Sequence, residues 1–376
     1  MGSGIAQVAA QSGHDVLVYD TNDRALINAK IKLGKVLDRL VEKEKVTEEE
    51  ADAIFNRIKW EGNLKPFASC GLIIEAIVER LDAKKSVFST LEELVDDNAI
   101  LATNTSSLSI AAISAGMKHP NRLLGIHFFN PAPLMPLVEI IPSLQTDEAI
   151  TRQAEELITS WKKVTVLAKD TPGFIVNRVA RPFYSEAIKM YEEGFADMAT
   201  IDWAMKQIGG FRMGPFELMD LIGHDVNYVV TETVWTQFYY DPRFKPSITQ
   251  KRLTEAGLFG RKSGKGFYDY AKDAEKPSPV EDEQLGDKIV DRIVAMLINE
   301  AADAVFLNIG TPADIDLAMT KGVNYPKGLL QWANEIGLDV VLNRLNGMHE
   351  YYGDDRYRPC PLLKNLAKEG GTFNLE

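Results

Sequence analysis

The feature that most constrains the fold is an internal repeat in the second half of the sequence. Residues 200–205 (TIDWAM) match residues 314–319 (DIDLAM), and residues 222–226 (IGHDV) match residues 336–340 (IGLDV). Both matches have the same offset of 114 residues (314 − 200). A constant offset without gaps indicates one duplicated structural unit, because biased composition does not keep a register over such a distance.

Helical spacing of apolar residues and glycine breaks predict that the repeated unit is all-α. The first copy spans residues 171–272 and the second spans residues 285–376. A segment rich in charge and proline, from Ala271 to about Gln284, reads as the linker between them.

The first 170 residues alternate short apolar runs with helical segments. Continuous apolarity is typical of strands that helices cover on both faces. A charged helical region reaches to about residue 58, with a capping box at residues 47–50 (TEEE) that starts a second helix. The region therefore predicts a Rossmann-type, doubly wound α/β sheet over residues 1–170. The predicted strands are 16–19, 72–77, 99–103, 123–129, 137–141 and one near 164–167.

Composition excludes several classes of protein. A net charge of −12 argues against a nucleic-acid partner. The chain has no apolar run long enough for a bilayer and no signal-peptide pattern, so a cytoplasmic protein without a membrane partner is expected. Cys70 and Cys360 are the two cysteines and lack metal-ligand spacing, so no metal is expected.

Polar residues that could carry chemistry follow or interrupt the apolar runs. His127 ends one run, and Glu139 lies inside the next. A carboxylate that holds an imidazole makes a general base, although a structural His–Glu contact is the plainer alternative. Ser106 follows another run and could instead cap a helix. Asn177 opens the helical region and could instead make an interdomain hydrogen bond.

One acid points to the cofactor. Asp20 ends the strand 16–19, where dinucleotide-binding folds place a carboxylate on the adenosine ribose. A carboxylate there repels a 2′-phosphate, and the next two residues, Thr21 and Asn22, supply no arginine. NAD is therefore expected rather than NADP.

Together, residues 104–107 (NTSS), 125–131 (GIHFFNP), 137–141 (LVEII) and 170–178 (DTPGFIVNR) give the chain a close similarity to the 3-hydroxyacyl-CoA dehydrogenases. The resemblance implies NAD-dependent oxidation of an (S)-3-hydroxyacyl-CoA, with His127 as the base and Glu139 as its orienting carboxylate. It also implies that Ser106 and Asn177 contact the substrate oxygen.

The resemblance further implies cofactor contacts and a coenzyme A site. Gly2, Glu79, Lys84, Ser106 and Asn130 match NAD-binding positions of the family, with Ser106 at the junction of cofactor and substrate. Lys43 and Lys35 belong to a basic set that could meet the nucleotide end of coenzyme A or simply form a solvated helix face. This set, in one predicted helical segment, comprises Lys30, Lys32, Lys35, Arg39, Lys43 and Lys45.

The doubled helical domain resembles the longer enzymes of phenylacetate degradation, which act on 3-hydroxyadipyl-CoA. A 3-hydroxybutyryl-CoA enzyme of β-oxidation and fatty acid metabolism is the close alternative. Single-copy relatives pair their helical domains between subunits. The second copy is therefore expected to act as an internal pseudo-dimer partner, and a homodimer is also allowed.

One part of the family pattern is absent from this sequence. The family begins with a strand and a glycine-rich turn, whereas this sequence begins at Met1-Gly2, inside that turn. The sequence therefore predicts an N-terminal truncation, by a late start assignment or as a fragment, and a sheet without its first strand. A non-catalytic protein of the same fold, as in lens crystallins, or an inactive fragment is the alternative function.

Overall fold

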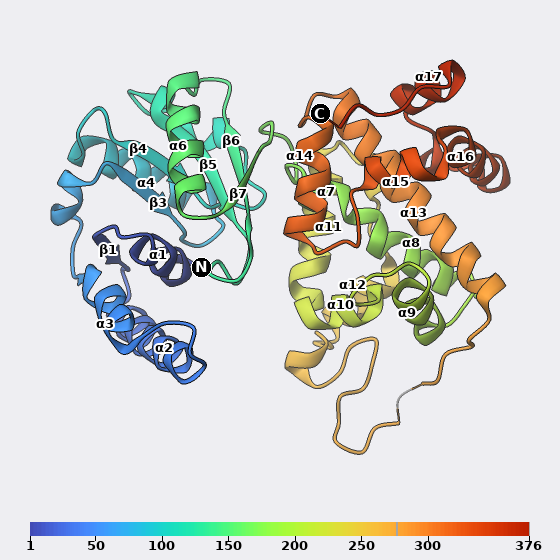
Figure 1. Cartoon of the computed structure of the whole chain (residues 1–376), viewed down its shortest axis with the longest axis horizontal. Helices are drawn as coiled ribbons and strands as arrows, with labels where there is room; N and C mark the ends of the chain where they lie inside the picture. Colours follow the sequence, from blue (N-terminus) through green and yellow to red (C-terminus); the bar gives the residue numbers. More distant parts are fainter. Residues whose placement is uncertain (276, 376) are drawn as a thin grey trace. The chain divides into compact units, whose positions relative to one another are not determined.

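The structure is a computed structural model that describes residues 1–275 and 277–375. It divides into two compact units, Met1–Asp170 and Thr171–Glu376 (Figure 1). None of the helices in the described ranges has both the length and the apolarity that a bilayer span requires.

The first unit is a Rossmann-like domain whose sheet is mixed. Five strands pair in the order β3-β4-β5-β6-β7, and only the β5–β6 pair is antiparallel. The strands are β1 (Val16–Tyr19), β2 (Ile58–Glu61), β3 (Leu72–Glu75), β4 (Ile100–Thr103), β5 (Leu123–Phe128), β6 (Leu137–Pro142) and β7 (Val164–Leu167). The helices are α1 (Gly2–Gln11), α2 (Asp23–Glu42), α3 (Glu48–Arg57), α4 (Leu81–Leu94), α5 (Ile110–Ser114) and α6 (Glu148–Ser160).

Burial follows the apolar runs that predicted the strands. Every residue of β4 and β5 is buried, as continuous apolarity indicated. The main core cluster joins α1, β4, β5, β6 and α6, and includes Ile5, Ile126, Ile140 and Ile158. This core fixes the strand ends on which the polar residues of the site stand.

Strands β1 and β2 form a separate two-stranded parallel sheet. Strand β2 was not predicted, because the sequence up to residue 58 has a helical pattern and the strand that follows is only four residues long. Among the described residues, no strand pairs with the second edge of β1 or of β3. Val16 and Leu72 nevertheless pack on the same core cluster.

The charged region between β1 and β2 forms two helices that contact each other. Asn22 caps α2, and the predicted capping box of α3 is present, with Thr47 and Glu50 bonding each other's backbone N–H. Helix α2 ends at Glu42. The expectation that Lys43 and Lys45 lie in the same helix as the other basic residues is therefore wrong. The backbone N–H of Lys43 donates to the Arg39 carbonyl and ends the helix there.

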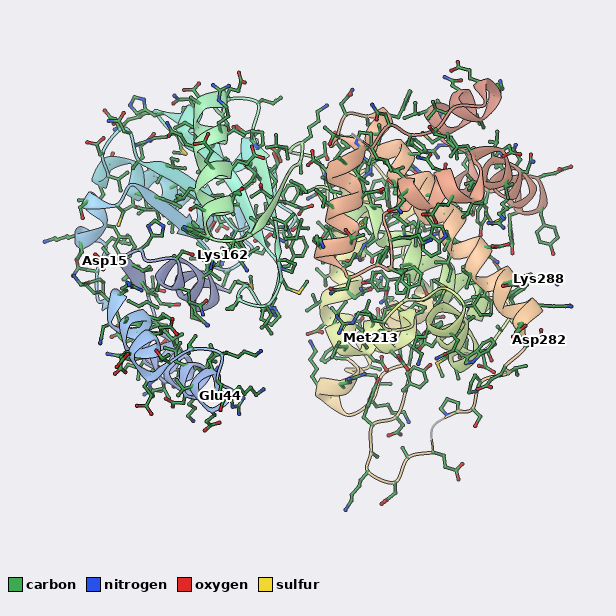
Figure 2. The ribbon with its side chains drawn as sticks, viewed as in Figure 1. Asp15, Glu44, Lys162, Met213, Asp282 and Lys288 are labelled. Carbon is green, nitrogen blue, oxygen red and sulfur yellow. The ribbon has the colours of Figure 1, made fainter. Side chains whose placement is uncertain are left out.

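The second unit is helical. Its longest helix, α13, starts at the Asp282 cap and runs past Lys288 (Figure 2). The helices are α7 (Val176–Val179), α8 (Arg181–Glu192), α9 (Met198–Gln207), α10 (Pro215–Ile222), α11 (His224–Gln237), α12 (Ile248–Glu255), α13 (Glu283–Phe306), α14 (Pro312–Leu317), α15 (Leu329–Ile336), α16 (Leu338–Tyr352) and α17 (Pro361–Glu369).

A helix-capping contact occurs twice in this unit at the offset of 114 residues. Asp202 accepts the backbone N–H groups of Phe216 and Glu217 at the start of α10. Asp316 accepts those of Leu330 and Gln331 at the start of α15. A Cβ atom at Gly214 or Gly328 would lie 2.3 or 2.2 Å from the respective carboxylate, so each cap requires glycine.

Reciprocal buried ion pairs join residues at the same offset. Arg178 donates to Glu300 at 2.6 Å, and Arg292 donates to Glu186 at 3.0 Å. Each arginine and each glutamate thus has its counterpart in the other pair.

Candidate active site

His127 and Glu139 face each other across the antiparallel strands β5 and β6. The strand register pairs them directly, and His127 Nδ1 lies 2.7 Å from Glu139 Oε2. The Glu139 side chain is fully buried and that of His127 is 7% exposed. A buried carboxylate at Nδ1 fixes the ring orientation and favours the tautomer whose Nε2 accepts a proton.

The serine loop after β4 is organised by Glu79. Glu79 Oε1 accepts bonds from the Thr105 hydroxyl at 2.5 Å and from the backbone N–H of Ser106 at 3.0 Å. It also accepts the backbone N–H and the hydroxyl of Ser107. Burial alone would raise the pKa of Glu79, but these bonds and the nearby Lys84 charge hold it below its usual value. One carboxylate therefore fixes the backbone that carries Ser106.

Lys84 lies beneath this loop in a buried ion-pair cluster. Its ammonium bonds both oxygens of Glu75, at 2.8 and 3.0 Å, and lies 3.2 Å from Glu79. Thr103 donates a further bond to Glu75. Lys84 is 1% exposed, and its ammonium ties together the two carboxylates beneath the loop. Its contact with NAD stays a prediction.

Several residues hold this region together in roles that were not predicted from the sequence. Glu75 ends β3, and Asn104 follows β4 and accepts the Phe128 N–H at 2.8 Å. Asp170 caps α5 through the N–H groups of Ile110 and Ala111. Each is a polar residue at a strand end, which is the signal that could have identified them.

The predicted NAD residues lie at separate points of the first unit. Asp20 follows β1, is exposed and accepts the Asn22 N–H at 2.8 Å. Gly2 is the first residue of α1, whose N-cap Met1 supplies no side-chain bond to the helix. Asn130 is exposed two residues after β5. Glu79 lies at the serine loop, so the structure brings Glu79 and Ser106 together.

The other predicted contacts are on different parts of the chain. Lys35 is exposed on α2, and Lys43 is exposed just after it. Asn177 belongs to α7 of the second unit, and its place beside His127 stays a prediction.

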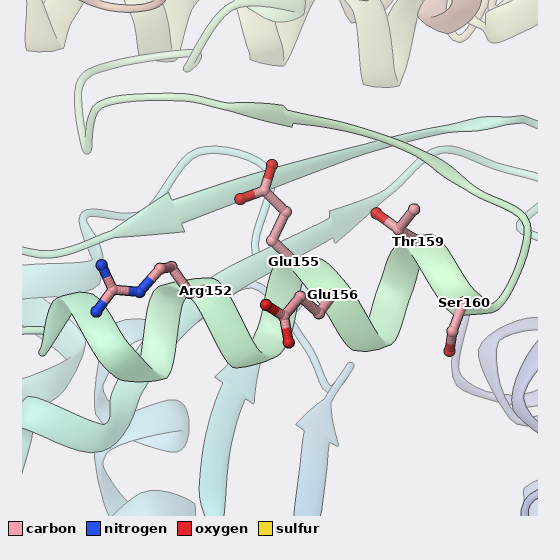
Figure 3. A pocket seen from close by; sticks show the side chains of 5 residues that line it. All are labelled: Arg152, Glu155, Glu156, Thr159 and Ser160. Atoms are coloured by element: carbon pink, nitrogen blue, oxygen red, sulfur yellow. The ribbon is translucent and has the colours of Figure 1, made fainter.

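An open hollow on α6 contains none of the predicted site residues (Figure 3). All of its lining comes from this one helix. The lining residues are Arg152, Glu155, Glu156, Thr159 and Ser160. Two carboxylates and a single arginine on a solvated helix surface do not assemble a catalytic group.

Comparisons with known proteins agree with this geometry. A family model described as "3-hydroxyacyl-CoA dehydrogenase, NAD binding domain" matches residues 1–171, and "3-hydroxyacyl-CoA dehydrogenase, C-terminal domain" matches residues 173–270 and 289–373. A 3-hydroxyadipyl-CoA dehydrogenase of Escherichia coli (strain K12) is 37% identical over 98% of this chain and 95% of its own length. This coverage does not support the expected N-terminal truncation.

Two solved structures are also similar. A crystal structure of 3-hydroxybutyryl-CoA dehydrogenase from Escherichia coli K12 has a TM-score of 0.94 and 36% identity, covering 98% of this chain and 96% of that one. The (S)-3-hydroxybutyryl-CoA dehydrogenase of Ralstonia eutropha has a TM-score of 0.70 and 37% identity, covering 72% of this chain and 96% of that one.

Proposed function

The chain belongs to the 3-hydroxyacyl-CoA dehydrogenase family, and we propose that its substrate within that family is (S)-3-hydroxyadipyl-CoA. It is an NAD-dependent enzyme that oxidises a 3-hydroxyacyl-CoA to the 3-oxoacyl-CoA. The proposed substrate is the one in the name of a relative that matches along nearly the whole chain. 3-Hydroxybutyryl-CoA is the second candidate, because another full-length relative carries that name.

The buried His127–Glu139 pair carries the chemical part of the proposal. His127 takes the proton from the 3-hydroxyl at Nε2, while Glu139 stabilises the imidazolium through Nδ1. The electron pair of the O–H bond forms the C3=O bond as hydride leaves C3. NAD, when bound, accepts that hydride. Ser106 and Asn177 supply neutral hydrogen bonds to the oxygen, without adding a titrating charge.

The residues of the first unit fit NAD. Asp20 offers an exposed carboxylate at the end of β1 for the ribose hydroxyls. The first turn of α1 presents backbone N–H groups that no capping side chain occupies, beside glycines at positions 2 and 4. An N-terminus of this kind suits a pyrophosphate. Glu79 and Asn130 complete the proposed cofactor contacts.

We also propose a position for one more parallel strand, between β1 and β3. Support comes from the two strand edges without a partner among the described residues, together with the shared packing of Val16 and Leu72 on one core. Backbone N–H and C=O groups at such edges remain unpaired or bond to water unless another strand pairs with them. A strand there would lead directly into α1 and its glycines.

Adding an N-terminal apolar strand and a glycine turn before Met1 is therefore expected to tighten NAD binding. Completing the sheet fixes α1, and the turn places further N–H groups against the pyrophosphate. Calorimetric titration of the chain with and without the extension, against NAD, makes the comparison. A matched extension with prolines in place of the apolar residues is the control. Equal affinity of the two forms would refute the proposed strand position.

The second unit is proposed to be two copies of one helical domain, residues 171–272 and 285–376, docked as a pseudo-dimer. The reciprocal Arg178–Glu300 and Arg292–Glu186 pairs support this arrangement. Phe211 and Tyr325, which are related by the same offset, stack edge to face at 4.9 Å. A residue that touches its own counterpart lies on the two-fold axis of an isologous interface.

Recognition of coenzyme A is proposed to involve Lys35 and Lys43. Both are exposed, so their ammonium groups are available to phosphates. Assays by NADH absorbance should show oxidation of 3-hydroxyacyl-CoA and no oxidation of the free hydroxy acid. Replacing both lysines by alanine should raise KM for the ester with a smaller change in kcat, because remote contacts bind ground and transition states alike.

The lysine control is an exposed lysine outside this basic set. Lys118→Ala removes one positive charge and leaves Lys35 and Lys43 in place, so it should leave KM unchanged. An unchanged KM in the double variant would reduce this set to a solvated surface. A wild-type chain that never forms NADH from the CoA ester would contradict the function itself.

A further inference from the structure

Arg181 is a buried arginine that has no carboxylate partner within the described part of the chain. It begins α8 and is 5% exposed. Its Nη1 donates to the Thr231 hydroxyl at 3.1 Å, and its Nε has no hydrogen-bond partner among the described residues. The phenols of Tyr184 and Tyr325 are close enough to interact electrostatically with the Arg181 guanidinium. Burial of this kind is costly for a cation and lowers the pKa of the guanidinium.

The other buried arginines of the unit differ from it. Arg178, Arg243 and Arg292 each bond at least one carboxylate at 3.0 Å or less. Arg356 lies 3.2 Å from Glu186. Arg181 alone among these five therefore keeps a positive charge that the described residues do not neutralise.

A second unpaired donor lies in the same surroundings. The Tyr325 hydroxyl is buried and has no hydrogen-bond partner among the described residues. Its ring lies 5.7 Å from that of Phe183, which meets the Tyr184 ring edge to face. The Arg181 guanidinium lies 4.9 Å from the centre of the Tyr184 ring. The contacts that link the two donors are therefore aromatic. A guanidinium N–H and a phenol O–H both donate, and a carboxylate accepts from both.

The duplicated sequence shows that the fold does not demand this polar set. At the offset of 114 residues, Arg181 corresponds to Ala295, Tyr184 to Ile298 and Thr231 to Leu345. All three counterparts are buried and apolar. The same helical position thus packs without a charge in one copy and carries an unneutralised arginine in the other.

The position of Arg181 suits the far end of an acyl chain. Asn177 lies in α7 and Arg181 opens α8 four residues later, across Ala180, whose backbone is in the right-handed helical region. A helical path of four residues advances about 6 Å along its axis. Asn177 is the proposed contact of the oxygen on C3. In a six-carbon dicarboxylic acyl group, the terminal carboxyl carbon is three bonds from C3.

We infer that Arg181 and the Tyr325 hydroxyl bind a second carboxylate at the end of the acyl chain, which selects dicarboxylic 3-hydroxyacyl-CoA esters. The inference rests on the proposed function and adds the two groups that recognise the second carboxylate of that substrate. An acyl chain that ends in a methyl group would leave the Arg181 guanidinium buried and unneutralised. Such a substrate would therefore bind poorly.

The test compares two substrates of equal length in the full chain. Wild type should have a kcat/KM for 3-hydroxyadipyl-CoA about 100-fold above that for 3-hydroxyhexanoyl-CoA. Arg181→Met should bring that ratio close to one, and Tyr325→Phe should lower it by about ten-fold. Arg344→Met, at a partly exposed arginine paired with Asp291, is the control and should leave the ratio unchanged. A wild-type ratio near one, or an Arg181→Met ratio equal to that of wild type, would overturn the inference.

A binding measurement separates this inference from the proposed function. A wild type inactive with both substrates would refute the function, and titration with adipyl-CoA and hexanoyl-CoA, which lack the hydroxyl, would still report on Arg181. Tighter binding of adipyl-CoA supports the carboxylate site, and equal binding overturns it. Both ligands are titrated against wild type and against Tyr325→Phe, so the result also decides the matter if Arg181→Met does not fold.

Discussion

Deleting residues 280–376 is expected to produce a chain that aggregates or dimerises through its first helical copy. The deletion removes Arg292 and Arg356, which neutralise the fully buried Glu186. It also removes Glu300 and Asp303, the partners of the fully buried Arg178. Uncovered charges and apolar surface of this kind favour pairing with a second copy of the same face. Light scattering after size-exclusion chromatography measures the outcome.

Point substitutions in the intact chain test the same interface without a deletion. Arg292→Met leaves Glu186 with an incomplete partner set, and should lower the free energy of unfolding by about 3 kcal/mol. Arg344→Met removes a partly exposed pair with Asp291 and should change it by less than about 1 kcal/mol. Denaturant unfolding of both variants makes the comparison. A monomeric, fully active deletion variant, or equal effects of the two substitutions, would rule out the pseudo-dimer.

Much of the first unit was predictable from local sequence signals. The strand runs around His127 and Glu139 are long and apolar, so β5 and β6 were identified, with ends one residue from those expected. The family resemblance is confirmed by the matches along the chain. The antiparallel pairing of β5 and β6, which sets His127 opposite Glu139, depends on the short connection between them and was not predicted.

Other features depend on contacts that no local pattern reveals. Glu79 was proposed as a cofactor residue, and its bonds to the Ser106 loop appear only once β3 and β4 are adjacent. Strand β2 is four residues long and follows directly on α3, so its short pattern could not be distinguished from that of the helix. Arg181 was not noted at all, because the sequence around it does not show which buried charge lacks a partner.

Replacing His127 with glutamine is expected to cost most of the activity while leaving the fold in place. Glutamine can occupy a similar volume between β5 and β6, but it does not accept a proton at neutral pH. A general base contributes on the order of 10²–10⁴-fold to turnover. Glu139→Gln should also slow turnover strongly, because the imidazolium would lose the charge 2.7 Å from Nδ1. His119→Gln, at an exposed histidine, is the matched control and should behave as wild type.

The most direct test of the catalytic assignment is the turnover number of His127→Gln for NADH formation from (S)-3-hydroxyadipyl-CoA. It is measured beside wild type and His119→Gln, with thermal unfolding of all three as the check on folding. We expect His127→Gln to unfold at nearly the wild-type temperature and to turn over about 10³-fold more slowly. A folded His127→Gln variant with turnover close to that of wild type would show that His127 is not the base.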